Sequence, residues 1–207
     1  MNEIFREYED CDYLQCESLV NQAWKFDDIF APDKLSNLIK YIYTKGSIVS
    51  SNYKMVIEVD GKVVGFIFGF NELAKKPSKN ILFSLNVSWR SIWVKTEKPV
   101  DKNELVNAMN THEKNKAKIV GKRKSEIMLF VIDEKYQRKG YGKKLWLGFK
   151  DYCQNSGVNT IIVKTNKLGA SRFYEKLGFT HLANFDSPAH EFAMKAGQAC
   201  MYKYIFN

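Results

Sequence analysis

The sequence lacks long apolar runs, a leader segment and any clustered cysteines. The longest apolar run, residues 63–70, falls far short of the roughly 20 residues that a membrane-spanning helix needs. Residues 1–13 lack the apolar core of a signal peptide. The 4 cysteines show no C-x-x-C spacing and the 3 histidines no ligand spacing, which argues against a disulfide framework and a metal site. We therefore expect a soluble, cytoplasmic protein with no metal and no membrane partner.

Positive charge is in excess, and its meaning is open from composition alone. The chain of 207 residues carries a net charge of +9, much of it in residues 114–124. Such an excess fits nucleic acid or small anionic ligands, and it equally fits a lysine-rich solvated surface. No basic groove with interleaved aromatic residues is visible, so nucleic acid is possible but not favoured. The length predicts a single domain covering residues 1–207.

Hydrophobic periodicity predicts a chain that alternates between strands and helices. Strands are expected at 3–9, 53–59, 62–70, 126–132, 159–165, 179–185 and 198–206, with helices at 14–24, 32–46, 81–93, 101–116, 140–157 and 168–179. Asp60-Gly61 predicts a hairpin turn, Gly46 is expected just past the end of its helix, and Asp101 is expected as a cap. From residue 126 onward, strand, helix and strand form a β-α-β unit with parallel strands. The fold class is therefore α/β, in the broader α+β sense.

A glycine-containing turn connects the strand at 126–132 to the helix that follows it. The stretch 137–143 reads QRKGYGK, with two glycines and three cationic side chains. Amides at a helix N-terminus are unpaired donors in a positive field, and glycines let a ligand approach them. The turn predicts a phosphate or pyrophosphate cradle, although a tight turn with solvated lysines would also fit. The motif is neither a Walker A loop nor a dinucleotide-binding fingerprint.

Two landmarks together resemble a known superfamily. The pattern Gln137-x-x-Gly140-x-Gly142 and the later segment 170–179, ASRFYEKLGF, resemble the acetyl-CoA signature and the second landmark of the GCN5-related N-acetyltransferase (GNAT) superfamily. The resemblance covers residues 1–70 and 126–207. It implies the GNAT acyl-CoA N-acyltransferase fold, a central mixed twisted sheet with splayed parallel strands flanked by helices, here with a helical insertion at about 71–125.

The resemblance also implies acetyl-CoA as co-substrate and assigns the residues that bind it. The pantetheine arm would lie beside the strand end, and the pyrophosphate would lie on main-chain amides of the turn. The implied cofactor-binding residues are Phe130, Val131, Ile132, Gln137, Arg138, Lys139, Gly140, Tyr141, Gly142, Lys143, Asn166 and Phe173. Relatives commonly carry an asparagine about seven residues before the landmark tyrosine; here Lys167 has that spacing, and Asn166 is one position away.

Two residues are implied in catalysis. Tyr174 matches the tyrosine that protonates the departing sulfur, with a packing aromatic as the alternative. Glu126 resembles the carboxylate that many relatives use as a base, with an exposed strand-end residue as the alternative; several relatives rely on solvent instead. An amide near Val131 would stabilise the oxyanion.

The acceptor is the least determined part of the expected reaction. The leading interpretation is a small-molecule amine. The alternatives are a macromolecular amine, on aminoacyl-tRNA or a ribosomal protein N-terminus, and a non-catalytic acyl-CoA sensor. Residues 24–30, 71–125 and 186–197 are expected around the acceptor, where Trp89, Trp93, Phe26 and Phe30 either line a pocket or pack the body. A monomer and a homodimer are both compatible with the sequence.

Overall fold

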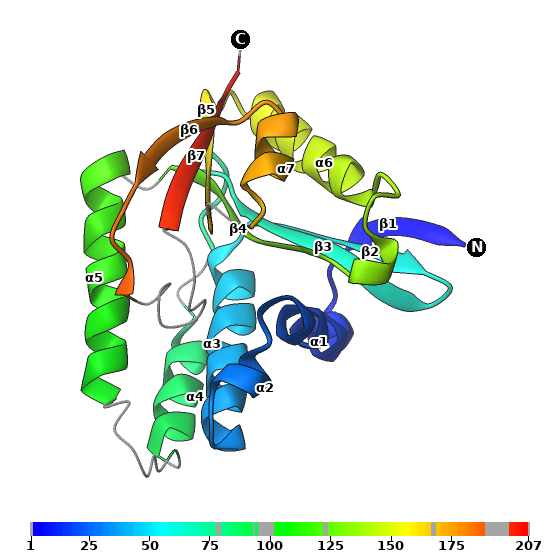
Figure 1. Ribbon diagram of the computed structural model, residues 1–207. Coiled ribbons are helices and arrows are strands. Elements are labelled where there is room, and N and C mark those ends of the chain that lie inside the picture. Colours follow the sequence, from blue (N-terminus) through cyan, green and yellow to red (C-terminus); the bar gives the residue numbers. More distant parts are fainter. Residues whose placement is uncertain are drawn as a thin grey trace.

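The computed structural model describes residues 2–77, 80–92, 94, 102–121, 124–166, 169–188 and 199–206. A mixed sheet forms the centre of the molecule (Figure 1). Its strands are β1 (Glu3–Glu7), β2 (Tyr53–Val59), β3 (Lys62–Phe70), β4 (Ser125–Ile132), β5 (Thr160–Asn166), β6 (Thr180–Asn184) and β7 (Ala199–Ile205). The sheet has 7 strands in the order β1-β2-β3-β4-β5-β7-β6. β4 and β5 are paired in parallel, whereas the other neighbours are antiparallel.

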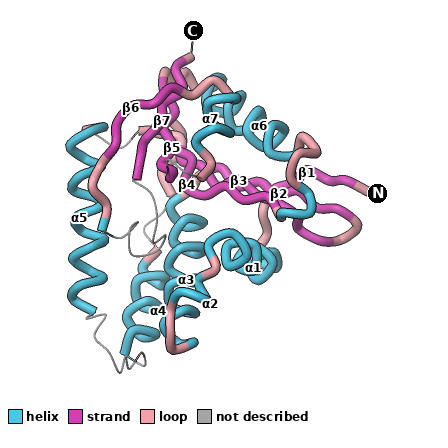
Figure 2. Tube along the Cα trace, viewed as in Figure 1, coloured by secondary structure: helices cyan, strands magenta, loops and turns pink. Residues whose placement is uncertain are grey.

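Helices cover both faces of this sheet (Figure 2). The helices are α1 (Tyr13–Trp24), α2 (Phe26–Ile29), α3 (Asp33–Ser50), α4 (Ile81–Ile92), α5 (Lys102–Val120), α6 (Tyr141–Asn155) and α7 (Ser171–Lys176), with 3-10 turns η1 (Asp10–Asp12) and η2 (Glu134–Tyr136). α1 to α4 lie on one face, α6 and α7 lie on the other, and α5 stands beside the β6 end. None of the described helices is both long and apolar enough to cross a membrane.

The order of elements confirms the predicted fold class and the helical insertion. Within the described part of the segment 71–125, the helices α4 and α5 separate β3 from β4, as expected. The short helix α2 was not predicted, because four residues do not show a helical period. Asp101, the expected cap of the second inserted helix, lies outside the described residues.

The predicted end of α3 at Gly46 is wrong. The helix continues to Ser50, and Gly46 is not among the residues with positive φ. A Cβ on Gly46 would lie 3.3 Å from Cζ of Phe83 on α4. The glycine therefore allows two helices to pack closely and does not terminate the first one.

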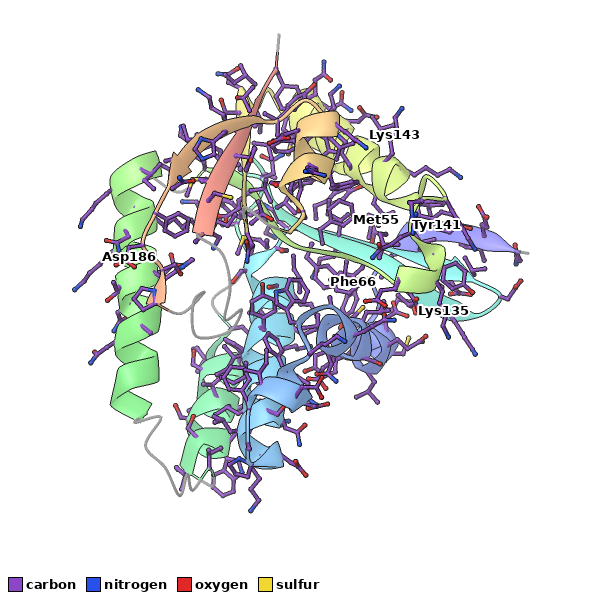
Figure 3. All side chains as sticks on the ribbon, in the orientation of Figure 1. Met55, Phe66, Lys135, Tyr141, Lys143 and Asp186 are labelled. Carbon is purple, nitrogen blue, oxygen red and sulfur yellow. The ribbon has the colours of Figure 1, made fainter. Side chains whose placement is uncertain are left out.

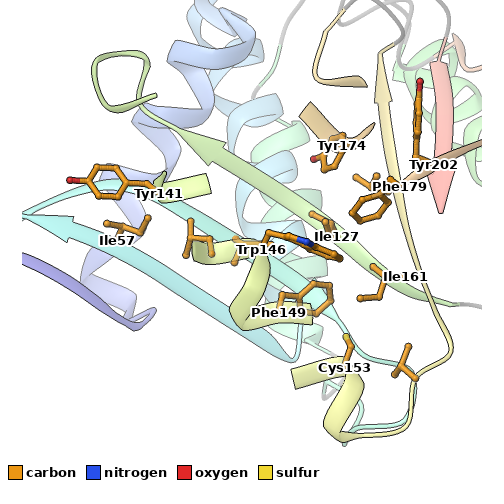
Figure 4. Packing of buried hydrophobic residues seen from close by; sticks show 14 of the residues in the cluster. Ile57, Ile127, Tyr141, Trp146, Phe149, Cys153, Ile161, Tyr174, Phe179 and Tyr202 are labelled. Atoms are coloured by element: carbon orange, nitrogen blue, oxygen red, sulfur yellow. The ribbon is translucent and has the colours of Figure 1, made fainter. Parts of the chain in front are cut away.

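Strand alternation sends apolar side chains to both faces of the sheet. On one face, Trp146 and Phe149 of α6 pack over Ile57, Ile127 and Ile161 (Figure 4). The opposite face carries Val56, Phe66, Phe68, Leu129 and Val131, covered by residues of α1 to α3. Because helices bury both faces, the central strands are apolar on both sides. A shift of one residue in a strand would move its side chains to the opposite face, so burial specifies the strand register.

Candidate functional site

β4 and β5 are paired only where both strands begin. The parallel ladder joins Ser125–Ile127 to Ile161–Val163 and does not continue beyond these residues. At the same point the pairing of β4 with β3 shifts register, since Phe68 opposes Leu129 whereas Gly69 opposes Ile127. Met128 is therefore an extra residue, and such a bulge bends a strand and increases its twist. The two parallel strands diverge from this residue onward, which is the splay that the resemblance implied.

The bulge determines which main-chain groups face the gap. The Asp133 amide donates to the Val64 carbonyl of β3 at 2.9 Å. Because main-chain groups alternate along a strand, those of Val131 also face β3, and those of Phe130 and Ile132 face the side of β5. Two of the three residues expected to bind pantetheine thus present main-chain groups to the gap, whereas Val131 contributes a side chain to the opposite core.

The turn after β4 presents amides and cationic side chains together. Arg138 and Gly140 have φ of 61° and 86°, both in the left-handed region. The first hydrogen bond of α6 runs from the Lys144 amide to the Gly140 carbonyl at 3.0 Å. The amides of residues 141–143 precede that bond and have no partner within the helix. Arg138, Lys139 and Lys143 are exposed around them, so the turn combines oriented donors with positive charge.

Side chains hold the turn in place. Gln137 Nε2 donates to the Ile132 carbonyl at 3.2 Å. The Tyr141 hydroxyl donates to Glu3 Oε1 on β1, and this hydrogen bond raises the pKa of Tyr141 to about 12. In Figure 3 Tyr141 lies near β1, at the beginning of α6. The Tyr141 side chain therefore anchors the start of α6 to β1, while the main-chain amide of Tyr141 stays at the turn.

The two glycines of the turn are needed for different reasons. A Cβ on Gly140 would have no atom within 4 Å, but its φ of 86° is one that L side chains rarely adopt. A Cβ on Gly142 would lie 3.2 Å from the ring of Phe173, whose centroid is 5.6 Å from that of Phe130. Gly140 is required by the conformation of the turn, and Gly142 by the approach of α7.

α7 brings Tyr174 into the core on the α6 side. Tyr174 is buried beside Phe179, with ring centroids 5.5 Å apart, and burial raises the pKa of its hydroxyl. The tyrosine therefore remains protonated at neutral pH, as a proton donor must. The same burial fits a packing aromatic, so the role of Tyr174 stays a prediction. Asn166 is buried at the end of β5, one position from Lys167, which lies outside the described residues.

Glu126 is buried between two lysines, and the expected alternative of an exposed strand-end residue is wrong. Its side chain is 1% exposed, and its Oε2 accepts from Lys116 Nζ of α5 at 2.6 Å. Lys164 Nζ of β5 lies 3.3 Å from Oε1. Burial opposes ionisation of Glu126, but the two ammonium groups outweigh it and hold its pKa below the ordinary value.

His112 extends this cluster from α5 toward the segment after β6. Its Nδ1 lies 2.7 Å from Ser187 Oγ, and its Nε2 lies 3.4 Å from Lys164 Nζ. Burial and the Lys164 charge lower the pKa of His112 to about 4. The imidazole is therefore neutral at pH 7, accepting at Nε2 and donating at Nδ1. The sequence pattern alone does not predict a role for Lys116, Lys164 or His112. A lysine within the otherwise apolar strand at 159–165 is the one signal that points to this cluster.

The aromatic residues expected around the acceptor occupy contrasting positions. Phe26 and Phe30 are buried, which confirms packing for both. Trp89 is 62% exposed on α4. Trp93 lies outside the described residues. Tyr43 of α3 is exposed at its edge, with ring centroids 5.1 Å from Trp24 and 5.5 Å from Phe26.

Comparison with known proteins gives one family match and several similar folds. Residues 99–187 match the model described as the acetyltransferase (GNAT) domain. The solved structure of SsHAT is 14% identical with a TM-score of 0.69, covering 99% of this chain and 98% of its own. The PaiA N-acetyltransferase from Thermoplasma acidophilum, in complex with coenzyme A, is 15% identical with a TM-score of 0.57 and 100% coverage of both chains.

A third structure, yncA from Salmonella typhimurium, is a putative acetyltransferase with its cofactor acetyl-CoA. It is 14% identical with a TM-score of 0.55, covering 100% of this chain and 95% of its own. At these identities the three structures show a shared fold. No curated protein matches the sequence.

Proposed function

We propose that the chain is an acyltransferase of the GNAT superfamily, which the family match and the similar folds support, and that it transfers an acetyl group from acetyl-CoA to the primary amine of a small molecule. The transfer is direct, within a ternary complex of enzyme, acetyl-CoA and amine. One observation carries the proposal: β4 and β5 diverge after Ile127, and the diverging strand leads directly into a turn with outward amides.

In this proposal acetyl-CoA, the co-substrate of the GNAT domain, lies along the gap between the diverging strands and on the turn that follows β4. The pantetheine arm lies in the gap and exchanges hydrogen bonds with the main chain of Phe130 and Ile132. Its pyrophosphate lies on the amides of residues 141–143, where a helix N-terminus favours an anion. Arg138, Lys139 and Lys143 add positive charge at that position. Two of the similar structures were solved with coenzyme A or acetyl-CoA, which supports this placement.

The reaction forms a C–N bond and breaks a C–S bond. The acceptor ammonium, with an ordinary pKa near ~10.4, first loses a proton, and the free amine attacks the thioester carbon. An amide of Phe130 or Ile132 stabilises the oxyanion of the tetrahedral intermediate. When the intermediate collapses, Tyr174 donates its proton to the departing sulfur, whose thiol has an ordinary pKa near ~8.5.

The proton acceptor is either Glu126 or solvent, and the ion pairs favour solvent. A carboxylate held between Lys116 and Lys164 has a lowered pKa and is a correspondingly weak base. In this proposal Glu126 instead anchors the two lysines at the point where the strands begin to diverge. The acceptor's proton passes to water.

A small acceptor is favoured by the position of α5. The Lys116–Glu126 bond, the His112–Ser187 bond and a bond of 2.9 Å from Asn115 Nδ2 to the Asp186 carbonyl join this helix to β4 and to the segment after β6. In Figure 3 Asp186 lies beside α5. A helix held there forms a wall on the side of the sheet that carries Glu126, and it leaves less room for a folded protein substrate than for a small amine.

Thiol release from acetyl-CoA, measured across a panel of small amines, tests the proposal. At least one amine should increase release well above the rate without amine, and Tyr174→Phe should reduce that increase. If no amine has an effect while acetyl-CoA still binds, the alternative of an acyl-CoA sensor is correct. Acetylation of aminoacyl-tRNA or of a protein N-terminus, without activity on any small amine, would establish the macromolecular alternative.

A further inference from the structure

Lys164 lies where the gap between β4 and β5 begins. It directly follows Val163, the last residue of β5 in the parallel ladder. Ile161 and Val163 belong to the core under α6, whereas Ile162 packs against residues of α5. Because side chains alternate along a strand, Lys164 lies on the same side as Ile162, where it meets Glu126. Its ammonium group is therefore placed at the head of the gap, on the side of α5.

The Lys164 ammonium keeps a donor that its protein contacts do not use. An ammonium carries three N–H donors. Within the described part of the chain, Nζ contacts Glu126 Oε1 at 3.3 Å and His112 Nε2 at 3.4 Å. The Lys164 side chain is 24% exposed, against 1% for Glu126, so a ligand can reach it. Burial opposes the charge of Lys164, but the Glu126 carboxylate outweighs it and raises the pKa of Lys164.

The cluster around Lys164 holds more positive than negative charge. Lys116 and Lys164 share the single carboxylate of Glu126. His112 is neutral at pH 7, with a pKa lowered to about 4 by burial. Glu113 Oε1 lies 3.9 Å from His112 Nε2, but the Glu113 side chain is 67% exposed and is screened by water. As far as the structure describes this cluster, two shielded ammonium groups therefore share one shielded carboxylate, and an anionic ligand group would compensate the remaining charge.

Tyr43 connects Lys164 with the proposed proton donor. Burial is the main cause that raises the pKa of Tyr174, and the neighbouring Tyr43 hydroxyl adds to it. The same hydroxyl also acts on the charge of Lys164. The Tyr43 ring is held against Trp24 and Phe26, and the residue is 38% exposed. Lys164 is thus near the end of the gap where the thioester would react, and that end of acetyl-CoA is uncharged.

We propose that the acceptor is an amine that carries an anionic group close to its amine nitrogen, and that Lys164 binds this group. The inference rests on the acetyl transfer proposed above and narrows its substrate to carboxylated or phosphorylated amines. The third N–H of Lys164 donates to the anionic group, and such a charge-assisted hydrogen bond is stronger than a neutral one. A cationic polyamine would instead meet like charge at this position.

Matched amines that differ by one anionic group test the inference. Thiol release from acetyl-CoA is measured with phenylalanine and phenethylamine, and with O-phosphoethanolamine and ethanolamine. Rates are compared per free amine, because the two members of a pair differ in pKa. Wild-type kcat/KM should be at least about tenfold higher for the anionic member of one pair. The pair that shows this preference distinguishes a carboxylate from a phosphate.

Three variants assign the preference to a residue. Lys164→Met should abolish the preference by raising KM for the anionic amine, and Lys164→Arg should retain it because the charge is kept. Lys114→Met is the matched control, since Lys114 is an exposed lysine of α5. Equal acetyl-CoA affinity by calorimetry confirms that the variants are folded, and the wild-type comparison stands by itself if one of them is not.

The outcomes separate this inference from the proposed function. Equal or higher kcat/KM for the neutral amines would overturn the inference and leave acetyl transfer standing. Failure to acetylate any amine, although acetyl-CoA binds, would contradict the proposed function and with it the inference. An unchanged preference in Lys164→Met, or an equal loss in Lys114→Met, would show that Lys164 does not bind the anionic group.

Discussion

The Lys116 ammonium lies 2.6 Å from Glu126 Oε2, and this contact joins the inserted helix α5 to the first residues of β4. Both side chains are largely withdrawn from water. Burial of a charge is costly unless a partner compensates it. Removing Lys116 would leave the buried Glu126 carboxylate with Lys164, 3.3 Å from Oε1, as its remaining counter-charge. The contact therefore makes the insertion part of the stability of the central sheet.

Lys116→Met should destabilise the protein by less than the roughly 3–5 kcal/mol that breaking a buried ion pair from one side usually costs, because Lys164 still compensates part of the Glu126 charge. Urea unfolding at pH 7 measures the change in the free energy of unfolding. Lys114→Met is the matched control, because Lys114 is an exposed residue of the same helix. Equal losses in both variants would show that the Lys116 contact contributes no specific stability.

His112 should make the protein less stable in mild acid. Its pKa is lowered to about 4 in the folded state, below an unfolded value of about 6.5. Between these values the unfolded chain binds the proton and the folded chain does not, so stability falls as pH falls through this window. We expect a loss of about 2 kcal/mol from this residue between pH 7 and pH 5.

Urea unfolding of His112→Asn at pH 7 and pH 5 measures that loss as a reduced dependence on pH. His181→Asn provides the control, since His181 is exposed on β6. If His112→Asn retains the wild-type difference between the two pH values, His112 is not the residue responsible.

The elements of the fold could be predicted from the sequence because each has a strong period or a specific turn. Asp60-Gly61 joins β2 to β3, and Gly157 follows α6 with a φ of 78°. The glycine turn and the aromatic pair Phe173-Tyr174 were also visible, because their chemistry depends on residues close together in sequence.

The remaining features depend on contacts between distant residues. Met128 is one apolar residue in an apolar strand, and only its partners on β3 show that it is a bulge. Glu126 lies near the start of β4, and its buried charge is compensated by Lys116 and Lys164 from two other elements. Gly46 follows an apolar-periodic segment, as a glycine just past the end of a helix does. Its actual role, to let Phe83 of α4 pack closely, depends on a contact with a distant residue.

Tyr174→Phe should lower kcat by about 10²-fold or more with little change in acetyl-CoA affinity, as expected for loss of a proton donor. Steady-state kinetics with the best small amine, together with calorimetric binding, separates the two effects. Tyr152→Phe on α6 is the control, because Tyr152 packs beside Tyr53 with ring centroids 5.0 Å apart. Wild-type kcat in Tyr174→Phe would leave this tyrosine with a packing role alone.

Calorimetric titration with acetyl-CoA tests the turn most directly, and Gly140 is the cleanest position to change. Gly142→Val should also weaken binding, but its side chain would meet the ring of Phe173. Gly140 and Gly157 lie at opposite ends of α6, with φ of 86° and 78° and open space around each. Both substitutions therefore strain the backbone similarly, and only one lies at the proposed pyrophosphate site.

We expect Gly140→Val to reduce acetyl-CoA affinity by at least about tenfold, whereas Gly157→Val should leave it near the wild-type value. Undiminished affinity in Gly140→Val, or an equal loss in both variants, would contradict the claim that the amides of this turn hold the cofactor.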